Sequence, residues 1–144
     1  MMESLSNYIV GTFMKSGVNE RMYEYPQVLQ ATKVIGGKVV NPDGEQLGSL
    51  KELVIDLEDG RVSYAVLSFG GFMGMGDKLF AIPWEALILN PKDQTLILDV
   101  DKDVLKEAPG FDKDHWPDNA QYEAGWLLDI YEYYGYSPYW MPGK

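Results

Sequence analysis

The sequence predicts a mainly β protein: a small six-stranded β-barrel followed by an α-helical, aromatic-rich C-terminal tail. Between Val39 and Val100 the chain is a succession of short apolar runs broken by turn residues, the spacing of small all-β barrels. More than half of the aromatic residues fall after Gly110. A chain of 144 residues has the usual length of one domain. We therefore expect an N-terminal extension over residues 1–29, the barrel over 30–110, and a tail over 111–144 that packs on the barrel.

Turn residues divide the barrel into its expected strands. Asn41-Pro42-Asp43-Gly44 ends a strand near Val40, because proline presets φ, Asp43 can bond its own backbone and glycine supplies positive φ. Glu58-Asp59-Gly60 closes a hairpin between strands 50–57 and 61–69. The remaining strands are expected over 79–82, 87–90 and 95–100, and residues 101–107 form one or two helical turns.

The two hairpin strands carry different patterns. Strand 50–57 places Leu53, Ile55 and Leu57 on one face. Strand 61–69 is apolar on both faces, so both faces need cover. Either the tail or a second copy of the chain can supply that cover.

The tail predicts an amphipathic helix from about Asn119 to Tyr134. Asp118 and Gln121 match a capping box, and Gly135 suits the C-terminal stop. An apolar stripe recurs at every fourth position, and it consists of Tyr122, Trp126, Ile130 and Tyr134. That stripe predicts a helix that lies on the barrel.

Composition narrows the classes of function. The formal net charge of −10 opposes binding to nucleic acid, because phosphate backbones repel an acidic surface without a basic patch. The absence of cysteine removes disulfides, thiolate nucleophiles and cysteine-based metal sites. No segment has the apolar length of a membrane helix or the form of a signal peptide. We expect a cytoplasmic protein without direct membrane insertion.

Three motifs imitate chemical sites without completing them. The glycine-rich stretch 70–78 lacks the Gly-Lys-Ser/Thr ending of a phosphate-binding loop. Asp99, Asp101 and Asp103 resemble the start of a calcium loop that lacks its central glycine and final glutamate. His115 is the only histidine, so the usual metal or catalytic sets cannot form around it. We therefore predict no catalytic residue, cofactor or metal.

Three stretches within residues 33–84 resemble the PRC-barrel family of the photosynthetic reaction centre H subunit. They are Lys33 to Gly48 with its Asp43-Gly44 turn, the hairpin from Leu53 to Val62, and Phe69-Gly70-Gly71-Phe72 through Ile82-Pro83-Trp84. The tail, with Trp116-Pro117-Asp118 and Pro138-Tyr139-Trp140, is similar to stand-alone bacterial members. The resemblance implies a docking module without a shared catalytic site.

The leading hypothesis is a non-catalytic module for protein interaction and assembly, which self-associates as a homo-oligomer such as a dimer. A small-ligand or metal-binding protein is the alternative, suggested by the acidic surface and the aromatic tail. Candidate interaction residues are large apolar or aromatic side chains in a glycine-rich loop and in the tail. They are Phe72, Met73, Met75, Trp116, Tyr139 and Trp140.

Overall fold

The computed structural model describes residues 27–69, 78–90, 95–112, 114–117 and 125–141, together with the backbone of residues 9–10. Their strands form one sheet in the order β1-β6-β7-β2-β3-β4-β5-β8. The strands are β1 (Ile9–Val10), β2 (Lys38–Val40), β3 (Gln46–Asp56), β4 (Arg61–Phe69), β5 (Lys78–Pro83), β6 (Leu87–Asn90), β7 (Thr95–Leu98) and β8 (Phe111–Asp112). The helices are α2 (Ala31–Val34), the 3₁₀ turn η1 (Trp84–Ala86), α3 (Lys102–Lys106) and α4 (Trp126–Tyr133).

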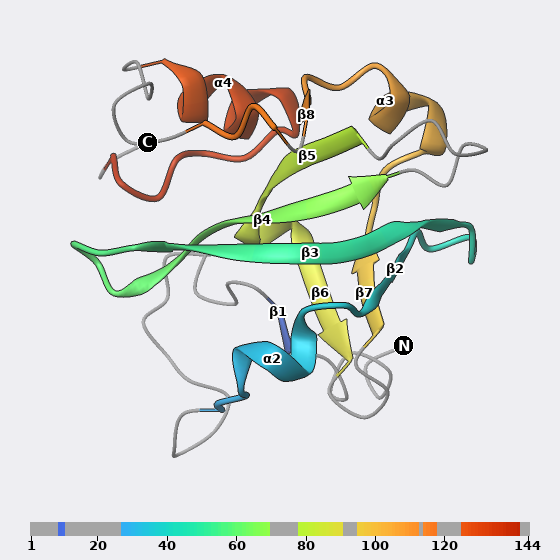
Figure 1. Cartoon of the computed structure of the whole chain (residues 1–144), viewed down its shortest axis with the longest axis horizontal. Helices are drawn as coiled ribbons and strands as arrows, with labels where there is room; N and C mark the ends of the chain where they lie inside the picture. Colours follow the sequence, from blue (N-terminus) through green and yellow to red (C-terminus); the bar gives the residue numbers. More distant parts are fainter. Residues whose placement is uncertain are drawn as a thin grey trace.

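The sheet is strongly bent, as Figure 1 shows: β6 and β7 run steeply across the direction of β3 and β4. All pairings are antiparallel except the short parallel contact between β2 and β7. Within the described residues β1 pairs only with β6 and β8 only with β5, so no ladder joins the two ends of the sheet. The mainly β class is confirmed, whereas the barrel is not closed.

The six predicted strands are all present as β2 to β7, because their turn residues act locally. Four short elements were not predicted from the sequence, and one of them is the 3₁₀ turn η1 between β5 and β6. The two-residue strands β1 and β8 extend the sheet at its edges, and the single helical turn α2 precedes β2. Residues 91–94, which link the strands predicted over 87–90 and 95–100, and the glycine-rich residues 70–77 lie outside the described residues.

The turn after β2 forms as predicted, with a different side chain at its centre. Gly44 has a φ of 88° and donates its N–H to the carbonyl of Asn41. The buried Asn41 side chain accepts hydrogen bonds from the N–H groups of Asp43 and Glu45 at 3.1 and 2.9 Å. Asn41, rather than the predicted Asp43, therefore bonds the turn backbone.

Gly48 marks the closest approach between β3 and β4. Its φ is 151°, and a Cβ there would lie 2.1 Å from the carbonyl oxygen of Ser68. That contact is with backbone held in the sheet, so it cannot be relieved by a side-chain rotation. The position therefore requires glycine.

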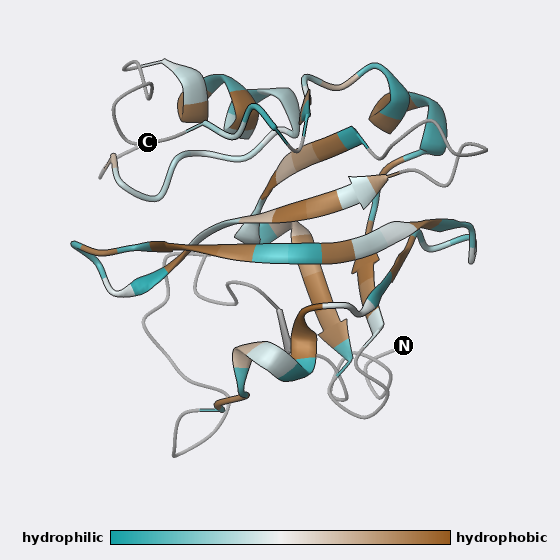
Figure 2. Ribbon diagram, in the orientation of Figure 1, coloured by the Kyte–Doolittle hydropathy of each residue, from teal (hydrophilic) through white to brown (hydrophobic). Residues whose placement is uncertain are grey.

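A hydrophobic core fills the inside of the bend. Its buried residues come from every long strand and include Val39, Leu50, Phe80, Leu87 and Leu96. In Figure 2, β5, β6 and β7 are correspondingly hydrophobic along most of their length, whereas β3 also carries hydrophilic stretches. Leu105 of α3 closes one end of this core and is fully buried.

A second, smaller core lies on the opposite face of β4 and β5, beneath α4. Tyr64 and Val66 of β4 join Leu79 and Ala81 of β5 there, and Ile130 of α4 completes the buried set. In Figure 1 α4 covers this face. The prediction that strand 61–69 is covered on both sides is confirmed, and the tail of the same chain supplies the outer cover.

The tail helix is shorter than predicted. The described helix α4 begins at Trp126 with Gly125 as its N-cap, so no uninterrupted helix runs from Asn119 to Tyr134. Residues 118–124, with the predicted capping box, lie outside the described residues. Glycine has a low helix propensity, which is consistent with a boundary at Gly125.

The end of α4 matches the prediction. Gly135 has a φ of 83°, its N–H donates to the carbonyl of Glu132, and the N–H of Tyr136 donates to the carbonyl of Tyr131. These are the two bonds of a Schellman motif, which satisfy the last helical carbonyls and reverse the chain. Among the described residues, no helix has the length and apolar character needed to cross a membrane.

Candidate functional site

The tip of the β3–β4 hairpin exposes two large aliphatic side chains. Ile55 is 50% exposed and Leu57 is 89% exposed. The alternation predicted that both lie on one strand face with Leu53. The register of the ladder shifts between Val54 and Ile55, and Leu57 already belongs to the turn. A register shift redirects the side chains that follow it, so the predicted face ends at Leu53.

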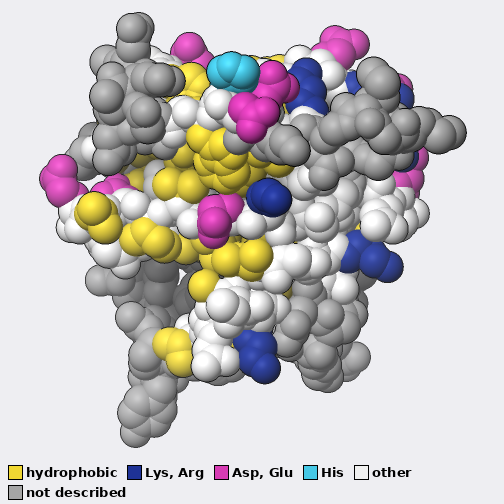
Figure 3. Space-filling model, viewed as in Figure 1, with side chains coloured by type: hydrophobic (Ala, Val, Ile, Leu, Met, Phe, Trp, Pro, Cys, Tyr) yellow, Lys and Arg dark blue, Asp and Glu magenta, His cyan; other side chains and the backbone are white. Residues whose placement is uncertain are grey.

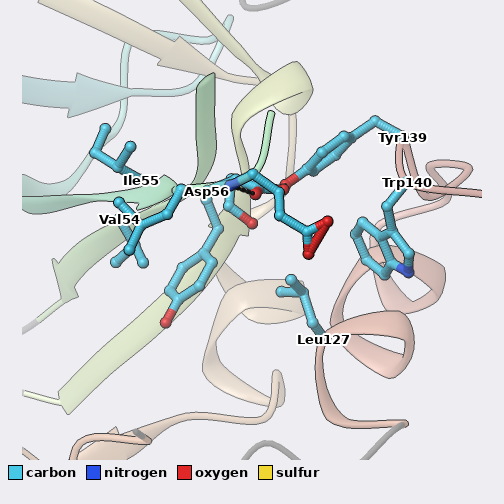
Figure 4. A pocket seen from close by; sticks show the side chains of 10 residues that line it. Val54, Ile55, Asp56, Leu127, Tyr139 and Trp140 are labelled. Atoms are coloured by element: carbon cyan, nitrogen blue, oxygen red, sulfur yellow. Dashed lines mark hydrogen bonds between the residues drawn. The ribbon is translucent and has the colours of Figure 1, made fainter. Parts of the chain in front are cut away.

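A groove separates this hairpin tip from α4 and the segment after it. Its volume is about 310 Å³, at the lower end of the range for ligand pockets. Figure 4 shows Val54, Ile55 and Asp56 on one side, and Leu127, Tyr139 and Trp140 on the other. The complete lining is Val54, Ile55, Asp56, Leu57, Glu58, Ser63, Tyr64, Leu127, Tyr139 and Trp140. Hydrophobic side chains also gather along β3 and between β3 and α4 on the face shown in Figure 3.

Contacts between distant parts of the chain shape this groove. The hydroxyl of Tyr139 donates to Oδ2 of Asp56 at 2.5 Å, across 83 positions of sequence. The Arg61 guanidinium carbon lies 3.9 Å from the centre of the Tyr139 ring, a cation–π contact. These contacts hold the C-terminal segment against the hairpin.

The same segment is held from beneath by α4. The ring of Tyr131 contacts Trp140 edge to face, with 5.0 Å between their centres. The fully buried Tyr131 donates its hydroxyl to the carbonyl of Ser63 at 2.7 Å. One tyrosine therefore connects the helix, the strand β4 and the wall of the groove.

The groove carries negative charge on the side that the hairpin forms. The hydrogen bond from Tyr139, then the N–H groups of Asp59 and Glu58, hold the pKa of Asp56 below its ordinary value of 3.8. Asp56 is therefore ionised at neutral pH. Burial, followed by the hydrogen bond to Asp56, raises the pKa of Tyr139 to about 12, so its hydroxyl keeps its proton.

The predicted interaction residues fall into three places. Tyr139 and Trp140 line the groove together. Trp116 lies elsewhere, half-buried against Phe111, with 5.3 Å between the ring centres. Phe72, Met73 and Met75 lie outside the described residues.

The wall of the groove that the hairpin supplies was not predicted from the sequence. Val54, Ile55, Leu57 and Leu127 were interpreted as strand or helix residues, not as parts of a shared surface. One local signal was present: Leu57 stands directly before Glu58-Asp59-Gly60, inside a tight turn where a large aliphatic residue has no neighbours to cover it.

The incomplete motifs found in the sequence form no metal-binding or catalytic site among the described residues. His115 is exposed, with Nδ1 3.6 Å from Oδ2 of the exposed Asp112. Asp101 is the N-cap residue of α3. The described part of the chain contains no group of three or more His, Asp or Glu side chains arranged to bind a metal ion.

The geometry defines a class of protein: a small domain with one bent sheet, a helix on its outer face, and an apolar groove where the two meet. The family model of the PRC-barrel domain matches residues 26–105, more than half of the chain. The chain belongs to the PRC-barrel family. No curated protein matches it.

Proposed function

We propose that this chain is a non-catalytic module that binds another protein through the groove and the hairpin tip. Membership of the PRC-barrel family supports a module without catalytic machinery. The observation that carries the proposal is the exposure of Leu57 and Ile55 beside the groove. An exposed aliphatic pair next to an apolar depression is typical of a protein-binding surface.

The shape of this surface suits a protein partner better than a flat ligand or a ligand enclosed in a cavity. The groove offers room for one or two side chains, and the projecting tip adds Leu57 to the contact area. Aromatic side chains such as Trp140 are enriched in the energetically important centres of interfaces. A partner that covers the tip and fills the groove buries apolar area that is now in contact with water.

The test compares three forms of the immobilised full-length chain in an extract of the producing organism, with retained proteins quantified by mass spectrometry. The wild type is compared with Leu57→Ser and with Val104→Ser. Val104 is a matched control because it is also exposed, at 42%, and lies on α3 outside the groove. Surface changes of this kind typically alter stability by less than about 0.5 kcal/mol, so both variants stay folded.

The expected result is a protein retained by the wild type and by Val104→Ser but lost from Leu57→Ser. Equal retention by all three forms contradicts the proposal, because binding then does not use the hairpin tip. Equal loss from both variants also contradicts it, since that pattern reports general apolar adhesion.

Self-association through the same surface is a second candidate. The two-sided strand 61–69 gives no support to self-association, because α4 of the same chain covers the outer face of β4. The exposed Ile55 and Leu57 remain as an apolar surface on which two copies could pair. Sedimentation over a wide concentration range should show a dimer that Leu57→Ser disrupts; a mass of 16.3 kDa at every concentration argues against self-association.

A further inference from the structure

The groove combines apolar walls with the carboxylates of two residues of the hairpin. Asp56 and Glu58 line it, and no Lys, Arg or His is among the lining residues. Within the described residues, neither carboxylate forms a salt bridge. The chain as a whole also carries a charge of −10, which adds to the negative potential at this surface.

The two carboxylates differ in what already binds them. Asp56 accepts hydrogen bonds from the Tyr139 hydroxyl and from the N–H groups of Glu58 and Asp59. The Glu58 carboxylate accepts none from the described residues. Glu58 is therefore the group in the groove that can accept hydrogen bonds from a ligand without breaking a contact inside the protein.

The structure contains an example of how a cation is held at this surface. The Arg61 guanidinium lies over one face of the Tyr139 ring, next to the ionised Asp56. Trp140 adjoins Tyr139, with 5.1 Å between the ring centres, and lines the same groove as Glu58. An aromatic face beside a carboxylate is thus one way to hold a cation. A tryptophan ring with a nearby carboxylate should hold a cation more strongly than a tyrosine ring does, because tryptophan is the best cation–π partner.

We infer that the groove accepts a basic side chain, Lys or Arg, that a partner protein carries beside an apolar residue. The cationic group binds at Glu58 and the face of Trp140, and the apolar neighbour packs on Leu57 and Leu127. This inference rests on the proposed function, since it names the chemistry of the partner for the same surface. Charge complementarity selects this partner over an acidic or a purely apolar one.

Three fluorescein-labelled nine-residue peptides test the inference by anisotropy with the full-length chain at about 0.15 M salt, where exposed charges beyond a Debye length are screened. One peptide alternates Leu with Arg, one alternates Leu with Glu, and one alternates Ser with Arg. We expect the Leu–Arg peptide to bind at least about ten-fold more tightly than the other two. A Leu–Glu peptide that binds as tightly as Leu–Arg overturns the inference about the cation and leaves the interaction surface standing.

Glu58→Gln identifies the carboxylate, and Glu107→Gln is the matched control. Glu107 is also exposed and follows α3, on the opposite side of Figure 1 from the hairpin tip, so its loss changes the net charge equally. We expect Glu58→Gln to weaken Leu–Arg binding about two- to five-fold and Glu107→Gln to leave it unchanged. Equal weakening by both variants overturns the inference, because the net charge alone then attracts the peptide.

The remaining outcomes separate the inference from the proposed function. Failure of all three peptides to bind overturns the inference. Retention of a protein partner that depends on Leu57 would still support the proposed function, because that experiment does not use these peptides. Thermal melting of Glu58→Gln against the wild type shows that each comparison is made on folded protein.

Discussion

Ile130→Ala should destabilise the whole domain, because Ile130 connects the tail to the sheet. Its side chain is 2% exposed and lies in the core formed with Tyr64, Val66, Leu79 and Ala81. The strands beneath it are paired in one antiparallel ladder over six residue pairs, so they cannot collapse easily into the space that alanine leaves. Substitutions of this kind cost about 2 to 5 kcal/mol, and we expect about 3 kcal/mol here.

Thermal unfolding followed by circular dichroism measures this loss. For a chain of this length, about 3 kcal/mol corresponds to a fall of roughly 10 °C in Tm. Asp129→Ala is the matched control, since Asp129 is the exposed neighbour on the same helix. If Ile130→Ala melts within about 2 °C of that control, which is less than 1 kcal/mol, the tail is not part of the folded unit and the reasoning fails.

Four further predictions follow from other contacts. Gly48→Ala should lower the free energy of unfolding by at least about 1 to 3 kcal/mol, because the added Cβ meets the Ser68 carbonyl. Urea denaturation measures this loss, and an unchanged midpoint would refute the geometry. A chain that ends at Gly110 should aggregate in gel filtration, because the outer face of β4 and β5 loses its cover; a monodisperse, cooperatively melting product would contradict this. The raised pKa of Tyr139, about 12, means that its contribution to stability is present below pH 10 and is lost as the pH rises through 12. Urea unfolding at pH 9 to 12 should therefore show a steeper loss for wild type than for Tyr139→Phe, and parallel curves would count against the hydrogen bond to Asp56. The chain should not bind duplex DNA or RNA at physiological salt, and salt-dependent micromolar binding by anisotropy would exclude that interpretation.

The strands and their turns could be predicted because their causes are local. Glycine at positions 44 and 60 adopts positive φ, as the turn chemistry requires, and Gly135 ends α4 for the same reason. Alternation and apolar runs then place β2 to β7 between these turns. No knowledge of the rest of the chain is needed for such features.

The candidate site could be predicted only in part. Tyr139 and Trp140 were recognised because large aromatic residues near a chain end need cover or a partner. Their neighbours Ile55 and Leu57 were assigned to one regular strand face with Leu53, since periodicity alone does not reveal the register shift after Val54. Trp116 is likewise a large aromatic residue of the tail, but it lies against Phe111 and not in the groove. Residue type therefore indicated an interaction surface without locating it.

The sequence by itself determined the mainly β class, the set of six strands, the turns and the apolar stripe of the tail helix, because each depends on the conformational preferences of neighbouring residues. Only the tertiary structure decided that α4 of the same chain covers β4, that the described sheet stays open, and that Asp56 meets Tyr139 across 83 positions. The physical reason is that packing between distant segments depends on their complementary shapes and on the free energy of burying them together. A one-dimensional pattern shows that a face must be covered, but the covering segment is selected by that packing.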